Sequence, residues 1–402
     1  MNVLWVKSGG LLPLDTGGKI RSFNIARELA RRHDVTVFTF YPTLTPDPHD
    51  RLGDPFVQVE RLPLHLPEKA GIRDTLAYAA NTLTRQPYQF RKYCRPEVGQ
   101  RLRQLVHHKR FEVLLCDYLL TAAVLPWEVR LPTVIFTHNV EAVIWQRRFL
   151  VNQNPLWKAV AWREYRTITR AERHFTELAD HVLTVSDDDR RSFLQFLPSD
   201  KVTTVPTGVD LDYYRPQPLA ERPALVFTGS MDWAPNEDAI LYFSSEILPL
   251  IEKEVPDVFL SVVGKKPSRK ILSLAAQNPA IRVTGAVDDI RPHVHAASVY
   301  IVPIRIGGGT RIKIFEAMAM GMPVVSTTIG AEGLPVEHAK NIVLADTPAD
   351  FAARVVELLK QRSVRERIGS AARGLVESRY SWPTVTTVVQ QTLERVAGQD
   401  AR

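Results

Sequence analysis

The sequence of 402 residues lacks the features of a disulfide-stapled, zinc-binding or membrane-spanning protein. Its two cysteines, Cys94 and Cys116, are too few for a disulfide framework or a zinc cluster, and they favour a reducing compartment. No stretch approaches the roughly 20 consecutive apolar residues that a membrane span needs. The apolar run at residues 2–6 ends at Lys7 and is too short for a signal sequence. We therefore expect a cytoplasmic protein.

The positive charge of the chain is unevenly distributed. The net charge is +7, and residues 61–110 alone hold eleven basic and three acidic side chains, a net charge of +8. Aromatic residues lie among these cations (Tyr78, Tyr88, Phe90 and Tyr93). The segment Arg61–Arg110 is compatible with docking on the inner face of an anionic membrane, with an anionic acceptor, or with a solvated basic face. It carries no recognised nucleic-acid-binding motif, so we do not expect nucleic acid as a partner.

Short apolar runs alternate with helical patterns along the chain, which predicts two doubly wound α/β domains with parallel sheets. The first series of strands is expected at about residues 2–6, 35–40, 56–62, 112–116, 133–137, 181–185 and 202–205. The second is expected at 224–228, 259–263, 281–284, 299–302, 324–326 and 341–344. Residues 154–178 are expected to form one long helix, and residues 348–397 helices with breaks near Ser363 and at Trp382-Pro383. The proline-containing run at 211–223 is the best linker candidate. We predict an N-terminal domain at residues 1–205, a second domain at 206–380, and a C-terminal helix at 381–402.

The segment of residues 299–327 carries the strongest signal for an anion site. It reads as a strand, a glycine loop (Gly307, Gly308 and Gly309), a helix capped by Thr310, and a second strand. A glycine loop before a helix leaves several backbone N–H groups aimed at one point, which suits a phosphate. Arg311 and Lys313 add two cations in the first turn, so we interpret them as a diphosphate clamp. Glu316, on the same helix face, could accept hydrogen bonds from a ribose.

Two loops of the N-terminal half contain further candidates. Gly17 and Gly18 stand at the start of a predicted helix, which suits a phosphate or a closely approaching sugar. The glycine spacing in this loop does not fit the G-x-G-x-x-G dinucleotide fingerprint, so NAD binding is not predicted. His138 follows the strand at 133–137, on the edge of the sheet where ligands bind. Glu141 is interpreted as a helix-starting carboxylate, and Asp117, on the same edge, is given no role.

Five blocks in the second half, in this order and spacing, resemble family 4 glycosyltransferases of the GT-B fold: VPTGVDLDYYRP, LVFTGSMDW, VTGAVDDIRPH, VYIVP and FEAMAMGMPVVST. TGGKIRSFNIARELARRHDVTVF and VLTVSDDD in the first half fit the same family, so the resemblance covers nearly the whole chain. The variant with GSMDW, GGGTRIK and GAEGL is most similar to bacterial sugar transferases associated with exopolysaccharide assembly.

This resemblance implies two Rossmann-like domains facing each other across a cleft, an acceptor-side domain at residues 1–205 and a nucleotide-sugar-binding domain at 206–380. It also implies C-terminal helices that pack back toward the N-terminal domain, to which the helix at 381–402 can cross. It implies a hexosyltransferase that moves a sugar, with retention, from a nucleotide diphosphate sugar to an acceptor hydroxyl without a metal or cofactor. Glu316 matches the second Glu of the family's E-x7-E motif, which binds the ribose. His138 resembles the His that touches the donor sugar, and Gly17 and Gly18 match the glycine loop near the donor phosphate.

The sequence departs from the family pattern at two places. The first Glu of E-x7-E would fall at Gly308. Many members also carry an Arg and a Lys after the first strand of the second domain, but here this donor-binding turn, which begins with Gly229 and Ser230, has neither. We expect Arg311 and Lys313, with Arg305, to replace those cations.

The residues leave the donor, the acceptor and several other functions open. UDP-sugars are favoured as donors and GDP-sugars come next, with cell-surface glycan or polysaccharide synthesis as the setting. The acceptor could be a lipid-linked saccharide, a glycolipid or another small molecule. Other readings are a GT-B phosphorylase or epimerase, a non-catalytic sugar-nucleotide-binding subunit, and a basic nucleic-acid-binding protein.

Overall fold

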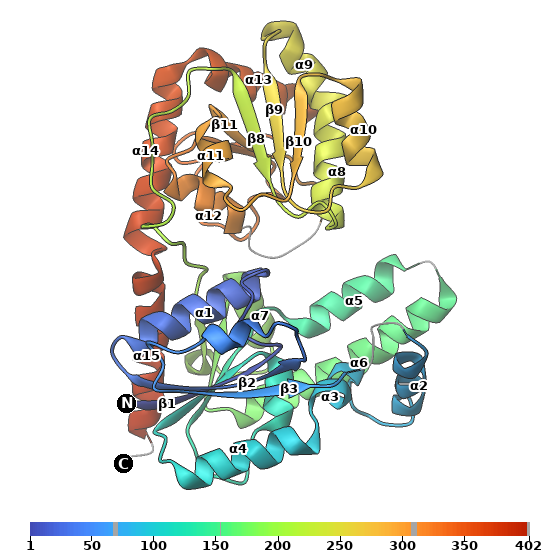
Figure 1. The fold of residues 1–402 in the computed structure, drawn as a ribbon, viewed down its shortest axis with the longest axis vertical. Helices are drawn as coiled ribbons and strands as arrows, with labels where there is room; N and C mark the ends of the chain where they lie inside the picture. The colour runs from blue at the N-terminus through green and yellow to red at the C-terminus, as the bar shows by residue number, and fades with distance from the viewer. Residues whose placement is uncertain (67–70, 153, 307–311, 400–402) are drawn as a thin grey trace. The chain divides into compact units, whose positions relative to one another are not determined.

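The computed structural model describes residues 1–66, 71–152, 154–306 and 312–399. The chain divides into two compact units. The first unit comprises Met1–Pro206 together with Val385–Arg402, and the second comprises Thr207–Thr384. Each unit is built around a wholly parallel sheet with helices packed on it (Figure 1). The prediction of two doubly wound, parallel-sheet domains is therefore confirmed.

The first unit contains a seven-stranded sheet with the order β3-β2-β1-β4-β5-β6-β7. Its strands are β1 (Asn2–Ser8), β2 (Asp34–Pro42), β3 (Gln58–Leu64), β4 (Val113–Asp117), β5 (Thr133–Phe136), β6 (His181–Thr184) and β7 (Val202–Thr204). The central strands are buried on both faces, as their continuous apolar runs predict. The strand order reverses between β1 and β4, and ligands of such sheets bind at the carboxyl ends of the strands beside this point.

Helices cover both faces of the first sheet, with α1 and α4 on opposite sides (Figure 1). The elements are α1 (Gly17–Ala30), η1 (Pro48–Arg51), α2 (Ile72–Asn81), α3 (Tyr88–Tyr93), α4 (Pro96–His108), η2 (Leu119–Val124), α5 (Glu141–Val151), α6 (Pro155–Leu178), α7 (Asp187–Phe193) and η3 (Ser199–Lys201). The last helix, α15 (Trp382–Gln399), contributes its residues from Val385 onward to this unit. Side chains of Thr16, Asn154 and Ser186 cap α1, α6 and α7 by accepting backbone N–H hydrogen bonds.

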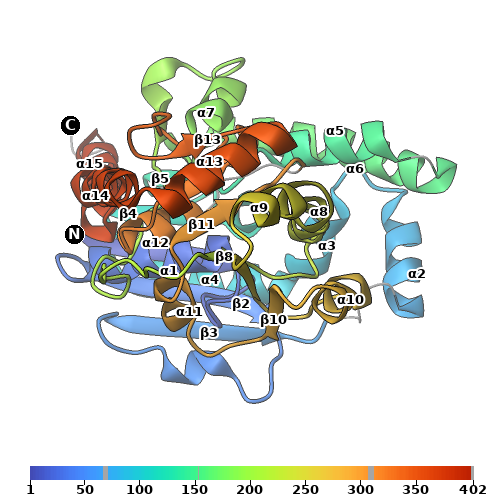
Figure 2. The same cartoon turned by 90° about the horizontal axis from the view of Figure 1, so that it is seen from above.

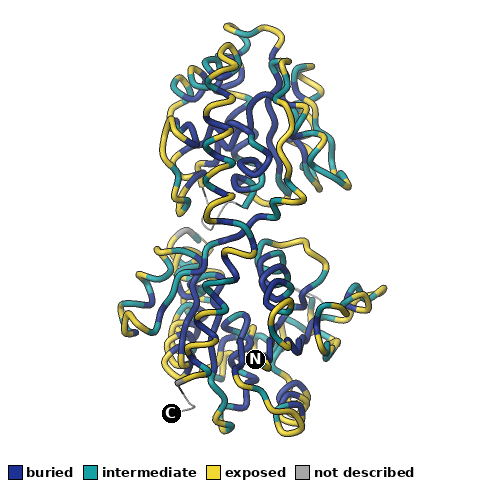
Figure 3. The backbone as a smooth tube through the Cα atoms, turned by 90° about the vertical axis from the view of Figure 1, so that its left-hand side faces the viewer, coloured by how far each residue is buried: buried dark blue, intermediate teal, exposed yellow. Residues whose placement is uncertain are grey.

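The second unit contains a six-stranded sheet with the order β10-β9-β8-β11-β12-β13, which reverses between β8 and β11. Its strands are β8 (Ala224–Thr228), β9 (Phe259–Val263), β10 (Ile281–Gly285), β11 (Val299–Val302), β12 (Val324–Ser326) and β13 (Val343–Leu344). Its helices are α8 (Ala234–Tyr242), a π-helical segment (Phe243–Ile247), α9 (Leu248–Glu254), α10 (Arg269–Gln277), α11 (Arg291–His295), α12 (Ile312–Ala319), α13 (Pro348–Lys360) and α14 (Arg362–Arg379). In each unit the strands are buried and the outer helical faces are exposed (Figure 3). Among the described helices, none has both the length and the apolar character needed to cross a bilayer.

Candidate functional site

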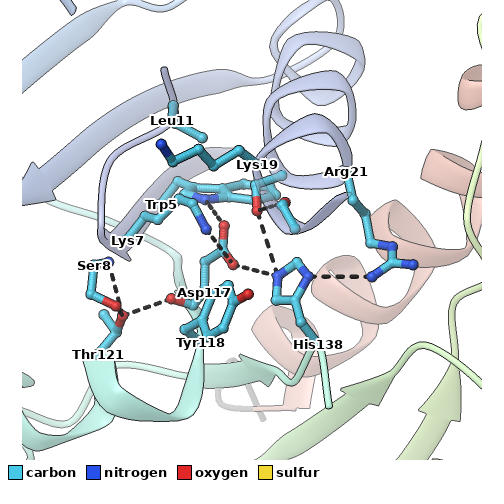
Figure 4. A network of polar contacts seen from close by, with 12 residues as sticks. Trp5, Lys7, Ser8, Leu11, Lys19, Arg21, Asp117, Tyr118, Thr121 and His138 are labelled. Atoms are coloured by element: carbon cyan, nitrogen blue, oxygen red, sulfur yellow. Dashed lines mark hydrogen bonds and ion pairs between the residues drawn. The ribbon is translucent and has the colours of Figure 1, made fainter. Parts of the chain in front are cut away.

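In the first unit, buried polar side chains meet at the carboxyl ends of β1, β4 and β5 (Figure 4). Asp117, the last residue of β4, is at the centre of this group. Its Oδ1 accepts a hydrogen bond from His138 Nε2 at 2.7 Å and lies 3.3 Å from the Lys7 ammonium. Its Oδ2 accepts from Trp5 Nε1 at 2.9 Å. The sheet order β1-β4-β5 therefore brings together side chains that are far apart in the sequence.

The neighbours of His138 decide its protonation. Arg21 Nη1 lies 3.4 Å from His138 Nδ1, and a guanidinium can only donate. Nδ1 must therefore be the acceptor, while Nε2 carries the proton that is donated to Asp117. Burial lowers the pKa of His138 to about 4, although the Asp117 carboxylate acts in the opposite direction. The imidazole is therefore neutral at neutral pH.

Lys7 and Asp117 form a buried ion pair. Burial lowers the pKa of Lys7, and the Asp117 carboxylate partly offsets this. Burial alone would raise the pKa of Asp117, but the charge of Lys7 and the hydrogen bond from His138 hold it well below its usual range. The carboxylate is ionised, so it can fix the orientation of the His138 ring.

Tyr118 packs against this group and has a strained backbone conformation. Its φ of 82° lies in the left-handed region, which non-glycine residues seldom adopt. Its ring stacks on His138 with 4.5 Å between the ring centroids, and Lys7 Nζ lies 4.6 Å from its centroid. A Cβ at Gly18 would lie 2.7 Å from the Tyr118 hydroxyl. Gly17 and Gly18 thus begin α1 beside Tyr118, and the second of them is required by a close contact.

His49, which the sequence did not mark as important, holds the loop before α1. It is fully buried, and its Nε2 accepts hydrogen bonds from the backbone N–H groups of Leu11 and Leu12, both at 3.1 Å. Its Nδ1 lies 2.9 Å from Asp47 and therefore carries the proton. A Cβ at Gly10, whose φ is 80°, would lie 2.6 Å from this ring. A lone His in the proline-rich segment PDPHD gave no signal of this role.

In the second unit, Lys313 reaches from α12 to the carboxyl end of β8. Its ammonium donates to Asn236 Oδ1 at 2.8 Å and lies 4.1 Å from the centroid of the Phe227 ring. Asn236 Nδ2 in turn donates to the Ser230 carbonyl at 2.8 Å. Gly229 has a φ of 154°, and a Cβ there would lie 2.7 Å from the Lys313 ammonium. The structure therefore brings Lys313, Gly229 and Ser230 together, with Asn236, which sequence reasoning missed, joining them.

Glu316 lies one turn further along α12. Its Oε1 accepts a hydrogen bond from the Tyr214 hydroxyl at 2.9 Å, and burial raises its pKa. Tyr214 was expected to lie in a linker, so this partner was not foreseen. The Arg305 guanidinium is paired with Asp238 at 2.7 Å and lies over the Tyr242 ring.

Five of the predicted site residues lie outside the described residues: Gly307, Gly308, Gly309, Thr310 and Arg311. Apart from Arg305, whose contacts are with Asp238 and Tyr242, the other candidates fall into one group in each unit. The first is centred on His138 and the second on Lys313. Within the described parts of the chain, no group of three His, Cys, Asp or Glu side chains could hold a metal ion.

Both halves of the chain match family models. Residues 16–213 match the model described as Glycosyltransferase Family 4, and residues 222–361 match the one described as Glycosyl transferases group 1. The chain is 28% identical over 268 residues to a GDP-mannose-dependent alpha-(1-6)-phosphatidylinositol monomannoside mannosyltransferase of Mycobacterium tuberculosis, covering 60% of this chain and 68% of that protein. It is 24% identical over 296 residues to an uncharacterized 44.6 kDa protein in the cps region of Klebsiella pneumoniae, covering 70% and 74%.

Solved structures share the fold over nearly the whole chain. Sucrose-phosphate synthase from Thermosynechococcus elongatus superposes with a TM-score of 0.73 at 17% identity, covering 99% of both chains. HepE from Anabaena, solved in complex with UDP, superposes with a TM-score of 0.70 at 15% identity, covering 98% of this chain and 100% of the other. At these identities the structural likeness concerns the fold.

Proposed function

Because the chain belongs to the group 1, family 4 glycosyltransferases, and is thus a hexosyltransferase of the GT-B fold that uses a nucleotide sugar, we propose a retaining, metal-independent reaction. In this reaction the bond between the sugar's anomeric carbon and the β-phosphate oxygen breaks on the face where the bond to the acceptor oxygen forms. The acceptor's proton passes to the departing phosphate, so no protein carboxylate has to act as a base.

The proposal assigns the nucleotide diphosphate to the group centred on Lys313. The single observation that carries it is the position of the Lys313 ammonium, held by Asn236 beside the Gly229 turn at the carboxyl end of β8. A cation fixed there can stabilise charge that develops on the leaving phosphate. Gly229, Ser230 and Arg305 belong to the proposed donor site, as do residues 307–311. Glu316, one turn deeper, is proposed to bind the ribose hydroxyls.

We assign the donor sugar and the reaction centre to the group that contains His138. A neutral imidazole whose Nε2–H is held by Asp117 keeps one orientation and carries no charge. The Gly18 contact with Tyr118 fixes the start of α1 next to this ring. His138 is therefore proposed as a group that contacts the sugar, without acting as a general base.

The donor is proposed to be a UDP-sugar, with a GDP-sugar next. The UDP-bound HepE structures favour the first, and the relative named as GDP-mannose-dependent favours the second. The relative in a cps region supports a role in cell-surface polysaccharide synthesis, and the phosphatidylinositol mannoside transferase supports a lipid-linked acceptor. We propose that the enzyme works at the inner face of the cytoplasmic membrane.

A panel of nucleotide sugars tests this function. The purified chain should slowly hydrolyse one UDP-sugar or GDP-sugar. When a cell extract supplies the acceptor, the transferred sugar should keep its anomeric configuration. Lys313→Met should slow this turnover about a hundredfold, while Lys253→Met, an exposed control on α9, should not change it. Calorimetric donor binding without any transfer would instead indicate a non-catalytic subunit, and an epimerised donor would indicate an epimerase. If no donor binds, the proposal is refuted.

A further inference from the structure

Several cations of the basic segment Arg61–Arg110 are paired with carboxylates, so they contribute less to an exposed positive surface. Ion pairs join Arg61 to Asp50 and Lys92 to Asp74, and two more join Arg101 to Glu60 and Arg103 to Glu128. The segment also contains three helices, α2, α3 and α4, and an apolar face on the first of them points outward.

Helix α2 turns its apolar face away from the protein. Ile72 is 82% exposed, Leu76 is 65% exposed and Leu83, just beyond the helix, is 91% exposed. Ile72 and Leu76, four residues apart, lie on one face of the helix, and Leu83 follows its end. Asp74 is turned inward, where it accepts hydrogen bonds from the Tyr88 hydroxyl and the Lys92 ammonium. The charge that α2 exposes is therefore positive.

The hairpin formed by α5 and α6 also combines exposed apolar side chains with exposed positive charge. Leu150, Leu156 and Trp157 are 66%, 71% and 59% exposed, and Trp162 is 44% exposed. Two of its cations stack on neighbouring aromatic rings, Arg148 on Trp145 and Arg166 on Trp162. The exposed charged side chains among the described residues 142–170 are all basic: Arg147, Arg148, Lys158, Arg166 and Arg170. The acid of this stretch, Glu164, is buried against Arg163.

The helix and the hairpin are neighbours. The Arg163 guanidinium of α6 donates to the backbone carbonyl of Asn81, the last residue of α2, and to those of Thr84 and Gln86 just beyond it. It lies 5.7 Å from the centroid of the Tyr78 ring. In two perpendicular views, α2 and the tip of the α5–α6 hairpin lie at the same end of the first unit (Figures 1 and 2). We call the exposed apolar and basic side chains of these elements the α2–hairpin surface.

We propose that the α2–hairpin surface docks on a bilayer that contains anionic lipids. A group of exposed Leu, Ile and Trp side chains on neighbouring elements is typical of an interaction site. Interfacial membrane binding combines such side chains, Trp above all, with Lys and Arg that meet the anionic headgroups. In both elements a cation stands next to an exposed apolar residue, as in Ile72-Arg73 and Trp157-Lys158, while Asp74 and Glu164 are turned inward. This charge complementarity favours an anionic lipid surface over a protein partner.

The proposal extends the proposed function, since a lipid-linked acceptor would be met at this surface, but its test does not depend on catalysis. The full chain is sedimented with phosphatidylcholine vesicles that either contain or lack phosphatidylglycerol. We expect binding to the anionic vesicles that weakens as salt is raised. Binding to neither vesicle, or equal binding to both, would overturn the proposal.

Two sets of variants locate the binding surface. Leu76→Ser combined with Trp157→Ser should weaken vesicle binding at least tenfold, whereas Leu272→Ser, on the half-exposed face of α10, should not. Arg147→Gln combined with Lys158→Gln should weaken it on the order of tenfold and flatten its salt dependence. Because these side chains are exposed, hydrolysis of a soluble nucleotide sugar should persist in every variant. Equal weakening by Leu272→Ser would mean that another surface binds the vesicles. The same would follow if the Leu76→Ser, Trp157→Ser variant left vesicle binding intact and instead dissociated a dimer of the chain.

Discussion

Single substitutions in the buried ion pair between Lys7 and Asp117 should together cost more stability than the double substitution. Their side chains are 1% and 0% exposed, and 3.3 Å separates Lys7 Nζ from Asp117 Oδ1. Asp117→Asn keeps the size of the side chain but leaves the ammonium without its counter-ion. Breaking a buried pair in this way costs about 3–5 kcal/mol. We expect the free energy of unfolding of the first unit to fall by roughly 4 kcal/mol.

Lys7→Met is the complementary change. It should cost less than Asp117→Asn, because the remaining carboxylate still accepts hydrogen bonds from Trp5 and His138. The double variant replaces both charges by neutral groups of similar size. It should recover most of the loss, so that the two single costs exceed the double cost by several kcal/mol, on the order that buried coupled pairs show.

Hydrogen exchange of peptides that span β1 and β4 measures the local stability of the first unit in each variant. A local measurement is needed because the chain has two units and need not unfold in one step. Arg173→Met, which breaks an exposed pair with Glu177, is the control and should cost less than about 1 kcal/mol. Additive single costs would refute the reasoning, because they would mean that Lys7 and Asp117 do not stabilise each other.

Three further predictions concern single residues. Lys313→Met should slow transfer about a hundredfold, equivalent to about 3 kcal/mol in the transition state, in a steady-state assay; unchanged turnover would exclude Lys313 from the phosphate site. Glu316→Gln should weaken binding of a ribonucleoside diphosphate about tenfold by calorimetry but leave a dideoxyribose analogue unaffected, and equal losses would contradict ribose binding. Burial raises the pKa of Glu172 from 4.5 to about 8. The folded chain therefore holds a proton that the unfolded chain releases, and stability falls as the pH rises through this window. Glu172→Gln should raise the melting temperature near pH 8 but not below pH 4.5. A rise below pH 4.5 with none near pH 8 would disprove this.

The sequence was sufficient to predict the strands of the second sheet. Four of them, β8, β9, β11 and β12, have the predicted bounds. Buried parallel strands appear as uninterrupted apolar and β-branched runs, and in this half each run ends at a glycine, a proline or a polar residue. The C-terminal helices were also predicted, with breaks near Ser363 and Trp382, because Pro383 and the loss of periodicity mark them. Local signals of this kind require no knowledge of distant residues.

Helices α2, α3 and α4 were not predicted. Their segment was interpreted through its charge, and α2 gave a misleading signal because its apolar face points outward, whereas a core helix turns that face inward. α3 is only six residues long, too short for a periodic pattern. The long helix predicted at residues 154–178 was found as α6, but the shorter α5 before it was not predicted.

Asp117 shows why the first group of site residues could not be assembled from the sequence. It was seen to lie on the ligand edge but was given no role, because its partners Lys7 and His138 are 110 and 21 residues away along the chain. Only the strand order places β1 and β5 on either side of β4. Individual candidates such as His138 can be found from a motif, whereas the charge that holds one in place depends on the sheet topology.

The group centred on Lys313 could be predicted more fully from the sequence, because the cations missing from the turn after β8 indicated that another side chain replaces them. The turn after β8 lacks the two cations of the family pattern, and Lys313 was expected to compensate for them. The structure places the Lys313 ammonium beside that turn, where Asn236 holds it and where a Cβ at Gly229 would lie 2.7 Å away. A Cβ on the turn would therefore crowd the ammonium, so that the Lys313 side chain would have to shift. The glycine in the turn and the lysine on α12 belong to one arrangement, in which the cation comes from a helix, and this supports Lys313 as part of the phosphate site.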